Sequence, residues 1–368
     1  MLNSAMPDEI NIEITSRCNM DCIFCPSGVC SRKKQDLPDE NVQKILNEIV
    51  DLKSQGFCIP PIAFHCLGEP LLNKHLDEYM SFCDKHDLSY WLVSNGLLFS
   101  DDRCDKLFAH SSLLKVEVSF HTISNDTLKL RWGGEKTLIS FNKYMTLVKK
   151  AVFNKNRIQN NIPIQIDVMY DKNLFEGHLF NAFKEKDLLL FFSIMSEWAD
   201  ELLNQYPSLK DTNKAFYKNP NKITNIGESI VYRNLNDIPK MLFEELPNNV
   251  LWVTWELAPK VFISVKKFFL FTPNESYLNR ISKNQCSFSI EEANNFNCNL
   301  SNSLVVLSNG DITFCCLDYE GELSCGNVAT MSIKDALTSE KRNFLLNSPD
   351  KFSYCRKCFG RKNIINKL

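Results

Sequence analysis

The sequence predicts an α/β protein whose main domain is a parallel-stranded barrel or partial barrel. Three observations lead to this prediction. The chain has 368 residues, 44% of them hydrophobic, which is enough to bury a large core. Strand-like and helix-like segments alternate regularly from about residue 10 to residue 195, and the alternation stops after about residue 196. Such regular spacing favours a barrel over an open doubly wound sheet.

The first repeat begins with an alternating strand at 10–15 and continues with a helix at about 39–55, which ends before Gly56. Further strands are expected at 62–66, 90–94, 115–120, 162–169 and 188–195. Helices are expected at about 73–86, near 101–110, around 138–148 and once more before 188. Six strands alternating with helices predict a partial (β/α)6 TIM barrel with its functional side chains at the C-terminal strand ends.

A different organisation follows the barrel. Residues 196–285 are rich in Asn, Lys, Pro and aromatic residues without an assignable period, and we interpret them as an insertion or a substrate lid. Residues 286–368 contain seven of the 15 cysteines and a hairpin-like segment with Asn309 and Gly310 at its turn. The expected domains are therefore 1–195, 196–285 and 286–368.

Charge and hydropathy narrow the class of protein. The 42 Lys and Arg residues nearly balance the 44 Asp and Glu residues, and the net charge of −2 provides no field that favours nucleic acid. The apolar run 261–271 contains two lysines and is too short to span a bilayer, and the first residues do not resemble a signal peptide. We expect a cytoplasmic protein without nucleic-acid or membrane partners, whose cysteines serve as metal or cluster ligands.

The first group of cysteines comes directly after the first strand. Cys18, Cys22 and Cys25 lie in one expected loop. A cubane iron–sulfur cluster takes four thiolates when the protein ligates it fully, so three leave one iron open to another ligand. A zinc knuckle completed by Cys30 is the alternative.

The spacing of these three cysteines, with Phe24 before the last one, resembles the signature of the radical S-adenosylmethionine (SAM) superfamily. The family's other motifs follow in its usual order over about residues 8–195. They are Gly68, Glu69 and Pro70 for the SAM amino group, with Leu67 replacing the first glycine of the motif, Ser94 and Asn95 at the end of the third strand, Ser119 and His121 for the ribose, and Arg131 for the methionine carboxylate. Taken singly, His121 is equally compatible with a barrel core position and Arg131 with a solvated charge.

This resemblance implies a chemistry. The family binds SAM at the open iron of a [4Fe–4S] cluster, cleaves it with one electron and generates a 5′-deoxyadenosyl radical, which removes hydrogen from carbon. A flavodoxin- or ferredoxin-type reductant is expected as the electron source.

The second group of cysteines resembles the C-terminal SPASM/Twitch extension of radical SAM enzymes. Its members are Cys298, Cys315, Cys355 and Cys358. Four thiols are a complete ligand set for one auxiliary [4Fe–4S] cluster, and nothing after Cys358 supplies a second. The resemblance therefore implies two clusters in all, the second held by an α+β domain. A zinc ribbon built from the same four cysteines is the alternative.

The family resemblance leaves several reactions open, because its members include aminocyclitol dehydrogenases, sugar epimerases, sulfatase-maturating enzymes and peptide maturases. Many peptide maturases carry a leader-binding module before the core, and the position of Cys18 leaves no room for one. We therefore expect a small-molecule substrate, a carbohydrate, cyclitol or similar polyol, that is dehydrogenated or epimerised. A peptide-modifying maturase and a non-catalytic iron–sulfur or zinc protein are the alternatives.

Three residues are candidates for completing the reaction. A dehydrogenase needs a base, for which Asp318 or His65 is suited, whereas an epimerase needs a hydrogen-atom donor such as the thiol of Cys316. Cys316 could instead pack beneath the cluster, and Asp318 could accept hydrogen bonds within a turn. We favour dehydrogenation, because an auxiliary cluster gives the substrate electron an acceptor.

Overall fold

The computed structural model describes most of the chain. The described residues are 6–134, 136–170, 185–207, 214–218, 230–231, 252–267, 276, 280, 292–293, 296, 298 and 302–359. The chain divides into two compact units. Unit 1 comprises Met1–Val93, His110–Leu114 and Leu270–Leu368, and unit 2 comprises Ser94–Ala109 and Lys115–Phe269.

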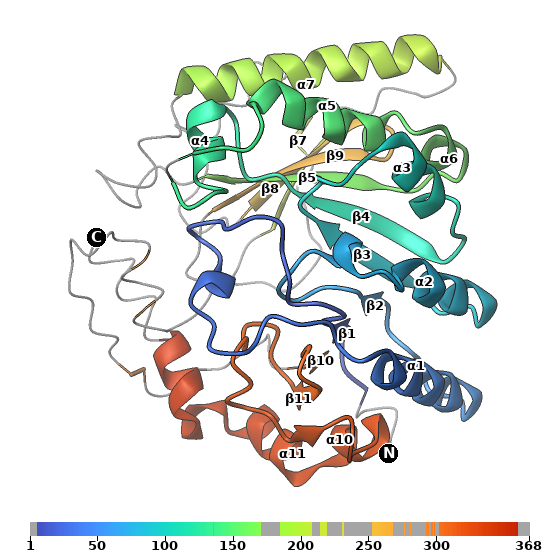
Figure 1. Ribbon diagram of the computed structural model, residues 1–368, viewed down its shortest axis with the longest axis vertical. Coiled ribbons are helices and arrows are strands. Elements are labelled where there is room, and N and C mark those ends of the chain that lie inside the picture. Colours follow the sequence, from blue (N-terminus) through green and yellow to red (C-terminus); the bar gives the residue numbers. More distant parts are fainter. Residues whose placement is uncertain are drawn as a thin grey trace. The chain divides into compact units, whose positions relative to one another are not determined.

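Unit 1 combines the N-terminal strands and helices with the C-terminal segment (Figure 1). Its elements are β1 (Glu9–Ile12), α1 (Asp39–Ser54), β2 (Ile62–Ala63), α2 (Leu76–Lys85), β3 (Tyr90–Ser94, whose last residue belongs to unit 2), β10 (Ser303–Val306), β11 (Asp311–Thr313), β12 (Gly326–Asn327), α10 (Ile333–Thr338) and α11 (Glu340–Asn347). The strand order in this unit is β12-β11-β10-β1-β2-β3. Strands β1, β2 and β3 are parallel, as their helical crossovers require.

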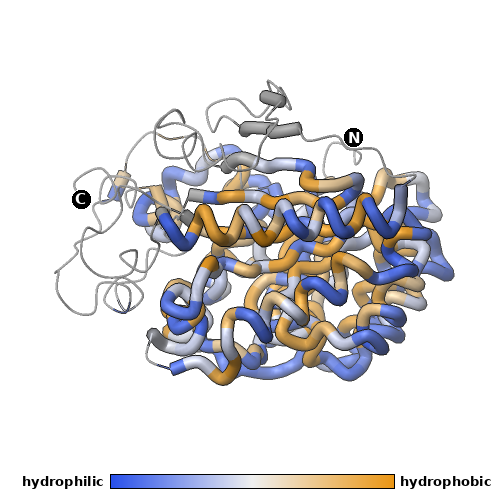
Figure 2. The backbone as a smooth tube through the Cα atoms, turned by 90° about the horizontal axis from the view of Figure 1, so that it is seen from above, coloured by the Kyte–Doolittle hydropathy of each residue, from blue (hydrophilic) through white to orange (hydrophobic). Residues whose placement is uncertain are grey.

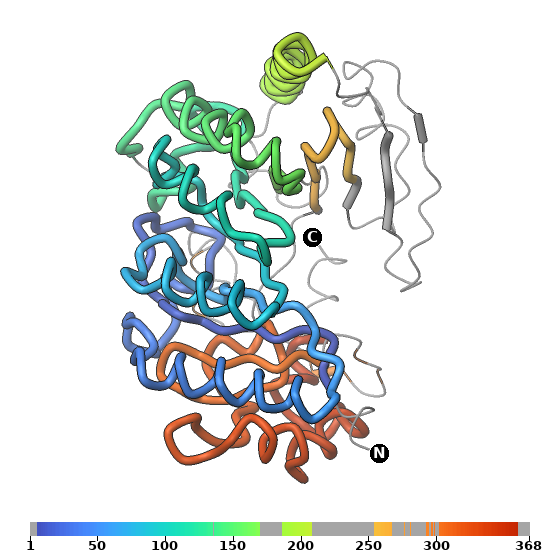
Figure 3. The backbone as a smooth tube through the Cα atoms, turned by 90° about the vertical axis from the view of Figure 1, so that its right-hand side faces the viewer, coloured from blue at the N-terminus to red at the C-terminus, as the bar shows by residue number. Residues whose placement is uncertain are grey.

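The C-terminal hairpin extends this sheet beside the first strand (Figure 3). β10 runs parallel to β1, with Glu9 opposite Ser303, and pairs antiparallel with β11. The expected turn at Asn309 and Gly310 is confirmed, because Gly310 has a φ of +88° and its N–H donates to the carbonyl of Leu307 at 2.8 Å. The N-terminal and C-terminal cysteine segments therefore belong to one compact unit.

Unit 2 continues the α/β pattern. Its elements are α3 (Asp101–Leu107), β4 (Leu113–Ser119, whose first two residues belong to unit 1), α4 (Asn125–Lys129), α5 (Phe141–Val152), α6 (Lys155–Gln159), β5 (Ile164–Tyr170), α7 (Glu185–Gln205), β6 (Lys214–Lys218), β7 (Ile230–Val231), β8 (Trp252–Ala258) and β9 (Val261–Lys267). β4, β5 and β9 are parallel neighbours, and β8 and β6 extend the sheet antiparallel beyond β9.

The expectation of a strand at 188–195 is wrong, because this segment lies within α7. Its buried residues recur with helical spacing, whereas Leu189 and Leu190 between them are exposed. The buried set is Leu188, Phe191, Phe192, Met195, Trp198, Ala199 and Leu202. A short apolar run does not distinguish a strand from a helix. The helical period of the buried residues shows that this segment is a helix.

The sixth parallel strand comes from a later part of the chain. β9 pairs in register with β5 over Ile164–Tyr170, with Asp167 opposite Ser264. It lies within the region 196–285, so part of that region is built into the sheet. Much of 196–285, like Cys286, lies outside the described residues, and the lid remains a prediction.

The other expected strands and the helices at about 39–55, 73–86, 101–110 and 138–148 are present, although β2 is only two residues long. The helix expected before residue 188 lies largely outside the described residues. α1 buries Val42, Ile45, Leu46 and Ile49 on one face, and hydrophobic and hydrophilic residues alternate along the helical tubes (Figure 2). Among the described helices, none combines the length and apolar character that crossing a membrane requires.

Candidate functional site

The first cysteine loop follows β1 and is ordered by its own backbone. Cys22 is buried, and Cys18 and Cys25 are half-buried. The N–H of Met20 donates to Cys18 Sγ at 3.4 Å, and the N–H of Cys25 donates to the carbonyl of Cys22 at 3.0 Å. An N–H directed at sulfur stabilises a thiolate, which is the form that binds iron. Phe24, between the last two cysteines, is buried.

The loop that contains Gly68 and Glu69 lies directly against the segment that leads into Cys18. The N–H of Glu69 donates to the carbonyl of Arg17 at 2.8 Å. Gly68 has a φ of +84°, and a Cβ there would approach the carbonyl oxygen of Thr15 to 2.3 Å, so only glycine permits this contact. Glu69 is buried, and its Oε1 accepts from the N–H of Leu71 in the turn begun by Pro70. Two motifs about 50 residues apart in sequence are thus held together.

Unit 2 holds the remaining residues expected to contact SAM. Ser94 and Asn95 are buried where β3 ends, and their side chains accept from the N–H groups of Gly96 and Leu97 at 3.0 and 2.9 Å. His121, just beyond Ser119 at the end of β4, has a φ of +44°.

His121 and Arg131 are electrostatic neighbours. Burial lowers the pKa of His121 well below its usual value, and the charge of Arg131 lowers it further. Arg131 itself is buried, so the alternative that it is a solvated charge is wrong. The imidazole of His121 is therefore neutral at physiological pH.

The structure also brings the second group of cysteines together. Cys315 and Cys355 are buried, and Cys298 and Cys358 are half-buried. Burial raises the pKa of the Cys315 thiol, and Cys316, Cys358 and Cys298 raise it further. Burial likewise raises the pKa of Cys355 to about 12, with Cys298 and Cys358 as the next causes. Cys315 and Cys355 thus each lie within electrostatic reach of Cys298 and Cys358.

The donor chemistry of both groups fits iron–sulfur clusters, which are bound by thiolates. Within the described ranges no three Cys, His, Asp or Glu side chains are placed to hold a metal ion as they stand. Binding a cluster must also deprotonate the buried thiols. Ligation of the clusters by these particular cysteines stays a prediction, which rests on donor type and motif.

The three candidates for completing the reaction lie in different surroundings. The carboxylate of Asp318 is buried and accepts from Thr313 Oγ1 at 2.6 Å and from the N–H groups of Glu322 and Leu323, both at 2.9 Å. This is the arrangement of a carboxylate that holds a turn. The ring of His65 lies 5.7 Å from that of Trp91. Roles for either residue as a base remain predictions.

Cys316 has a neighbour that sequence reasoning did not identify. Burial raises the pKa of Cys316 to about 12, and it raises the pKa of Cys66 well above the usual value for a thiol. Cys316 contributes to the shift at Cys66, so the two thiols lie near each other in unit 1. Both are protonated at physiological pH and retain the S–H bond that a hydrogen-atom donor requires.

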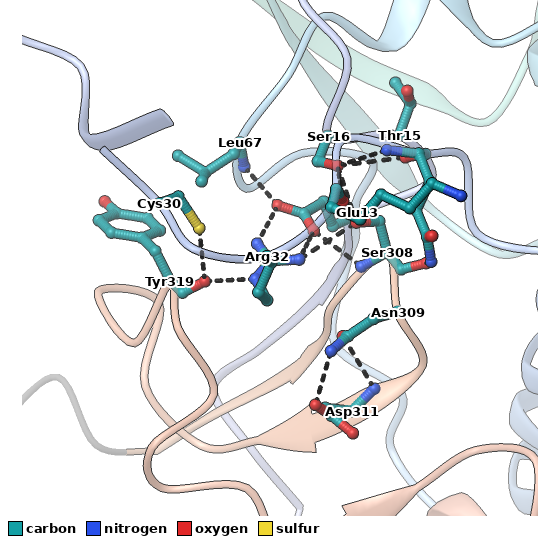
Figure 4. Close-up of polar contacts among 12 residues, drawn as sticks. Glu13, Thr15, Ser16, Cys30, Arg32, Leu67, Ser308, Asn309, Asp311 and Tyr319 are labelled. Carbon is teal, nitrogen blue, oxygen red and sulfur yellow. Dashed lines mark hydrogen bonds and ion pairs between the residues drawn. The ribbon is translucent and has the colours of Figure 1, made fainter. Parts of the chain in front are cut away.

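A buried ion pair joins three of these segments (Figure 4). Arg32, seven residues after Cys25, binds both carboxylate oxygens of Glu13 at 2.7 and 3.0 Å, and the two side chains are 6% and 0% exposed. Glu13 also accepts from the N–H of Leu67 at 3.0 Å and from that of Ser308 at 2.7 Å. Nε of Arg32 and Sγ of Cys30 both donate to the carbonyl of Tyr319.

This network, which we call the Glu13–Arg32 clasp, connects the segment after the first cysteines, the Gly68 loop and the loop after Cys315. Sequence reasoning missed it. Its only signal was a charged residue, Glu13, at one of the polar positions of the expected alternating strand 10–15. Cys30 also belongs to the clasp, because its thiol donates to the carbonyl of Tyr319.

Two protein families match the chain. Residues 12–155 match the radical SAM superfamily, and residues 298–359 match SPASM, an iron–sulfur cluster-binding domain. The first range contains Cys18, Cys22 and Cys25, and the second contains all four cysteines of the second group.

Similar individual proteins are known. The S-adenosyl-L-methionine-dependent 2-deoxy-scyllo-inosamine dehydrogenase of Niallia circulans is 38% identical over 160 residues, which cover 42% of this chain and 61% of the dehydrogenase. The match thus spans less than two thirds of that relative. An uncharacterised protein of Methanocaldococcus jannaschii is 25% identical over 242 residues, covering 62% of this chain and 75% of that protein.

A solved structure shows the same fold. The crystal structure of Streptococcus suis SuiB bound to precursor peptide SuiA superposes with a TM-score of 0.52 and 15% identity, covering 95% of this chain and 69% of SuiB. The fold class is therefore confirmed as a partial α/β barrel followed by a cluster-binding C-terminal domain.

Proposed function

The chain belongs to the radical SAM superfamily and carries a C-terminal SPASM domain, and from this premise we propose that it is an oxidoreductase acting on a small polar substrate. The two domains bind a [4Fe–4S] cluster with SAM and an auxiliary iron–sulfur cluster. In the proposal, Cys18, Cys22 and Cys25 hold the first cluster. The auxiliary cluster is held by Cys298, Cys315, Cys355 and Cys358.

The observation that carries the choice of substrate is the similarity to the 2-deoxy-scyllo-inosamine dehydrogenase, at 38% identity. That relative oxidises a cyclitol by its name. We infer a substrate of the same chemical class, a carbohydrate, cyclitol or related polyol, and dehydrogenation as the outcome. Epimerisation of the same kind of substrate is the second outcome that the chemistry allows.

The cofactors supply the hydrogen-abstracting radical when bound. The chain's own residues have to orient SAM and the substrate and to exclude water. We assign Gly68, Glu69 and Pro70 to the SAM amino group, and Ser94 and Asn95 to the third strand end that faces SAM. Ser119 and His121 are assigned to the ribose, and Arg131 to the methionine carboxylate.

The two outcomes place different demands on the protein after hydrogen abstraction. Dehydrogenation needs a group that accepts the hydroxyl proton, and Asp318 and His65 are the proposed bases from sequence. Epimerisation needs a hydrogen atom returned to the opposite face of the carbon, for which Cys316 is the proposed donor. The electron for SAM cleavage is proposed to come from a flavodoxin- or ferredoxin-type protein.

Turnover in deuterated buffer tests which outcome applies. The anaerobically reconstituted protein would be incubated with SAM, dithionite and 2-deoxy-scyllo-inosamine or other cyclitols, and the products analysed by mass spectrometry. The proposal predicts a ketone, and it predicts that the enzyme adds no solvent deuterium to the carbinol carbons of the substrate. An isomer of the substrate that carries one solvent deuterium on carbon, and that the Cys316→Ala variant does not form, would instead establish epimerisation.

A peptide substrate is the second candidate, because SuiB was crystallised with a precursor peptide. The likeness to SuiB concerns the fold alone, at 15% identity. Deuterium transfer into 5′-deoxyadenosine from perdeuterated candidate peptides, with no transfer from cyclitols, would favour this alternative over a small polyol.

A further inference from the structure

The three parallel strands of unit 2 have one apolar face and one polar face. Val116 and Val118 of β4, Ile164 and Ile166 of β5, and Val261, Ile263 and Val265 of β9 are buried. The alternate positions of the same strands are mostly polar, with apolar exceptions such as Met169 and Phe262. The polar ones are Lys115, Glu117, Ser119, Gln165, Asp167, Ser264 and Lys266. Because side chains alternate along a strand, these polar residues share one face. Packing in the hydrophobic core accounts for the residues of the apolar face, but it does not account for the polar residues of the other face.

Register places the polar residues beside one another. Ser119 lies opposite Asp167, and Asp167 lies opposite Ser264 on the next strand. The carbonyl of Asp167 also accepts from the N–H of His121 at 2.8 Å. The polar row therefore continues up to the end of β4.

An ion pair lies at the centre of this face. Lys266 Nζ is 2.5 Å from Asp167 Oδ2 and 3.8 Å from Glu117 Oε2, so one lysine lies between two carboxylates. Gln165 donates to the other oxygen of Asp167 at 2.7 Å. Asp167 is 3% exposed as a residue, whereas the side chain of Lys266 keeps 28% exposure. Asp167 is therefore nearly enclosed, whereas the side chain of Lys266 is partly exposed.

The donors and acceptors of this site fit a polyol that carries hydroxyl or amino groups. Each carboxylate oxygen has two lone pairs, and a lysine has three N–H donors. The contacts with Lys266 and Gln165 leave acceptor positions on Asp167 for a substrate O–H or N–H. Lys266 can direct a further N–H at a substrate oxygen.

The protonation of Asp167 suits proton transfer. Burial raises its pKa to about 6, and Lys266 opposes the rise. A base is most effective when its pKa lies near the operating pH.

We propose that Asp167, Lys266 and Glu117 form the polar substrate site of this protein, and that Asp167 accepts the proton released during dehydrogenation. The inference rests on the proposed function and names residues that its sequence-based assignments do not include. It applies to a substrate carbon that bears a hydroxyl group.

The step balances as follows. The substrate C–H bond breaks homolytically, and the hydrogen atom forms the methyl group of 5′-deoxyadenosine. The O–H bond of the resulting carbon radical then breaks, its proton moves to a carboxylate oxygen of Asp167, and a C=O bond forms. One electron leaves to an oxidised iron–sulfur cluster, the class of acceptor that a SPASM domain supplies.

The test separates binding, hydrogen abstraction and product formation in holoenzyme variants. The probe is 2-deoxy-scyllo-inosamine deuterated at the carbinol carbon. Binding is measured by calorimetry with SAM present and no reductant, so that this readout does not depend on turnover. Deuterium in 5′-deoxyadenosine and the amount of ketone are then measured after addition of dithionite.

Asp167→Asn is expected to lower ketone formation by about 100-fold or more, while deuterium still passes into 5′-deoxyadenosine. Lys266→Met is expected to weaken probe binding by about tenfold or more, as loss of a charged hydrogen bond does. In the double variant Asp167→Asn/Lys266→Met, Glu117 keeps its ion pair with Lys115 at 2.5 Å, so no buried charge is left unpaired. The double variant is expected to fold and to lose both binding and ketone. Asp101→Asn, which breaks the exposed pair with Lys150 at 2.7 Å in the same unit, is the matched control.

Wild-type ketone formation in Asp167→Asn, together with wild-type binding in Lys266→Met, would overturn the inference while the proposed function stands. If the wild-type protein transfers no deuterium from any cyclitol or polyol offered, the proposed function fails, and the inference fails with it. Loss of ketone in Asp101→Asn equal to that in Asp167→Asn would also overturn it.

Discussion

Asp167 and Asp318 are both buried carboxylates, and their neighbours equip them for different roles. Three hydrogen bonds from Thr313, Glu322 and Leu323 converge on Asp318 and hold the loop after Cys315 in its turn. Asp167 instead shares a lysine with Glu117 on the polar face of the unit 2 strands. We therefore assign the proton-accepting role to Asp167 and a role in holding the turn to Asp318.

The pH dependence of ketone formation should report on Asp167. Its carboxylate must be ionised to accept a proton, so activity should fall as the pH is lowered through about 6, the raised pKa of this group. The charged groups around it are Lys266 and Glu117, and Glu117 is also paired with Lys115. His121 is held neutral by its lowered pKa. Pre-steady-state ketone formation measured between pH 5 and pH 8 checks this. If the Asp167→Asn variant shows the same fall in activity at low pH as the wild type, the titration belongs to another group.

Asp318→Asn should destabilise the protein. An amide presents N–H donors where the carboxylate accepts three hydrogen bonds, so at least one buried donor is left without an acceptor, at a cost of about 1–3 kcal/mol in the free energy of unfolding. Denaturant unfolding of the variant and the wild type gives the difference. Full stability combined with lost ketone formation would point to a catalytic role for Asp318 instead.

The Glu13–Arg32 clasp ties β1, the Gly68 loop and the C-terminal hairpin of unit 1 to one buried charge pair. Unit 1 also contains an exposed pair with similar chemistry, in which Nη2 of Arg17 lies 2.5 Å from Oδ2 of Asp36 and the side chains are 49% and 34% exposed. The two pairs differ mainly in burial. They therefore allow a controlled comparison of what burial contributes.

Arg32→Met should lower the free energy of unfolding by about 3–5 kcal/mol, because it leaves the carboxylate of Glu13 buried without its partner. Arg17→Met should change it by about 1 kcal/mol or less, as is usual for an exposed pair. Chemical denaturation of both variants measures the contrast. Equal losses in the two variants would show that the clasp contributes no more than a surface contact.

The elements that sequence predicted correctly are those whose period is unambiguous. Helix α1 has a clear helical periodicity, and its bounds agree with expectation. Strand β3 is a short apolar run rather than an alternating one, and its expected bounds are also confirmed. The run 188–195 is apolar at nearly every position, so only its packing partners reveal that it is helical. β9 was missed because its pairing with β5 joins residues about 100 positions apart, which no local pattern encodes.

The parts of the site that could be predicted from sequence are those whose residues lie in short local motifs. The cysteines and the Gly68 and Glu69 pair were found this way, and the backbone contact between Glu69 and Arg17 brings two of these motifs together. Lys266 and Arg32 were not found, because each acquires its role from a partner distant in sequence. Polar residues at alternate positions of an apolar strand, such as Asp167, were the available signal.

The reconstituted chain should contain two cubane clusters, hence about eight irons and eight sulfides. The triple variant Cys18→Ala/Cys22→Ala/Cys25→Ala should retain about four irons, because the second group of cysteines is untouched. Iron analysis and electron paramagnetic resonance check both values. A triple variant without any cluster would contradict the assignment of Cys298, Cys315, Cys355 and Cys358.

Transfer of deuterium tests the central claim most directly. The reduced holoenzyme would be given SAM and 2-deoxy-scyllo-inosamine deuterated at its carbinol carbons, with other deuterated polyols in parallel. The account predicts deuterium in 5′-deoxyadenosine together with an equivalent amount of ketone, and neither from the Cys18→Ala variant. Formation of no 5′-deoxyadenosine by protein with both clusters filled would contradict it.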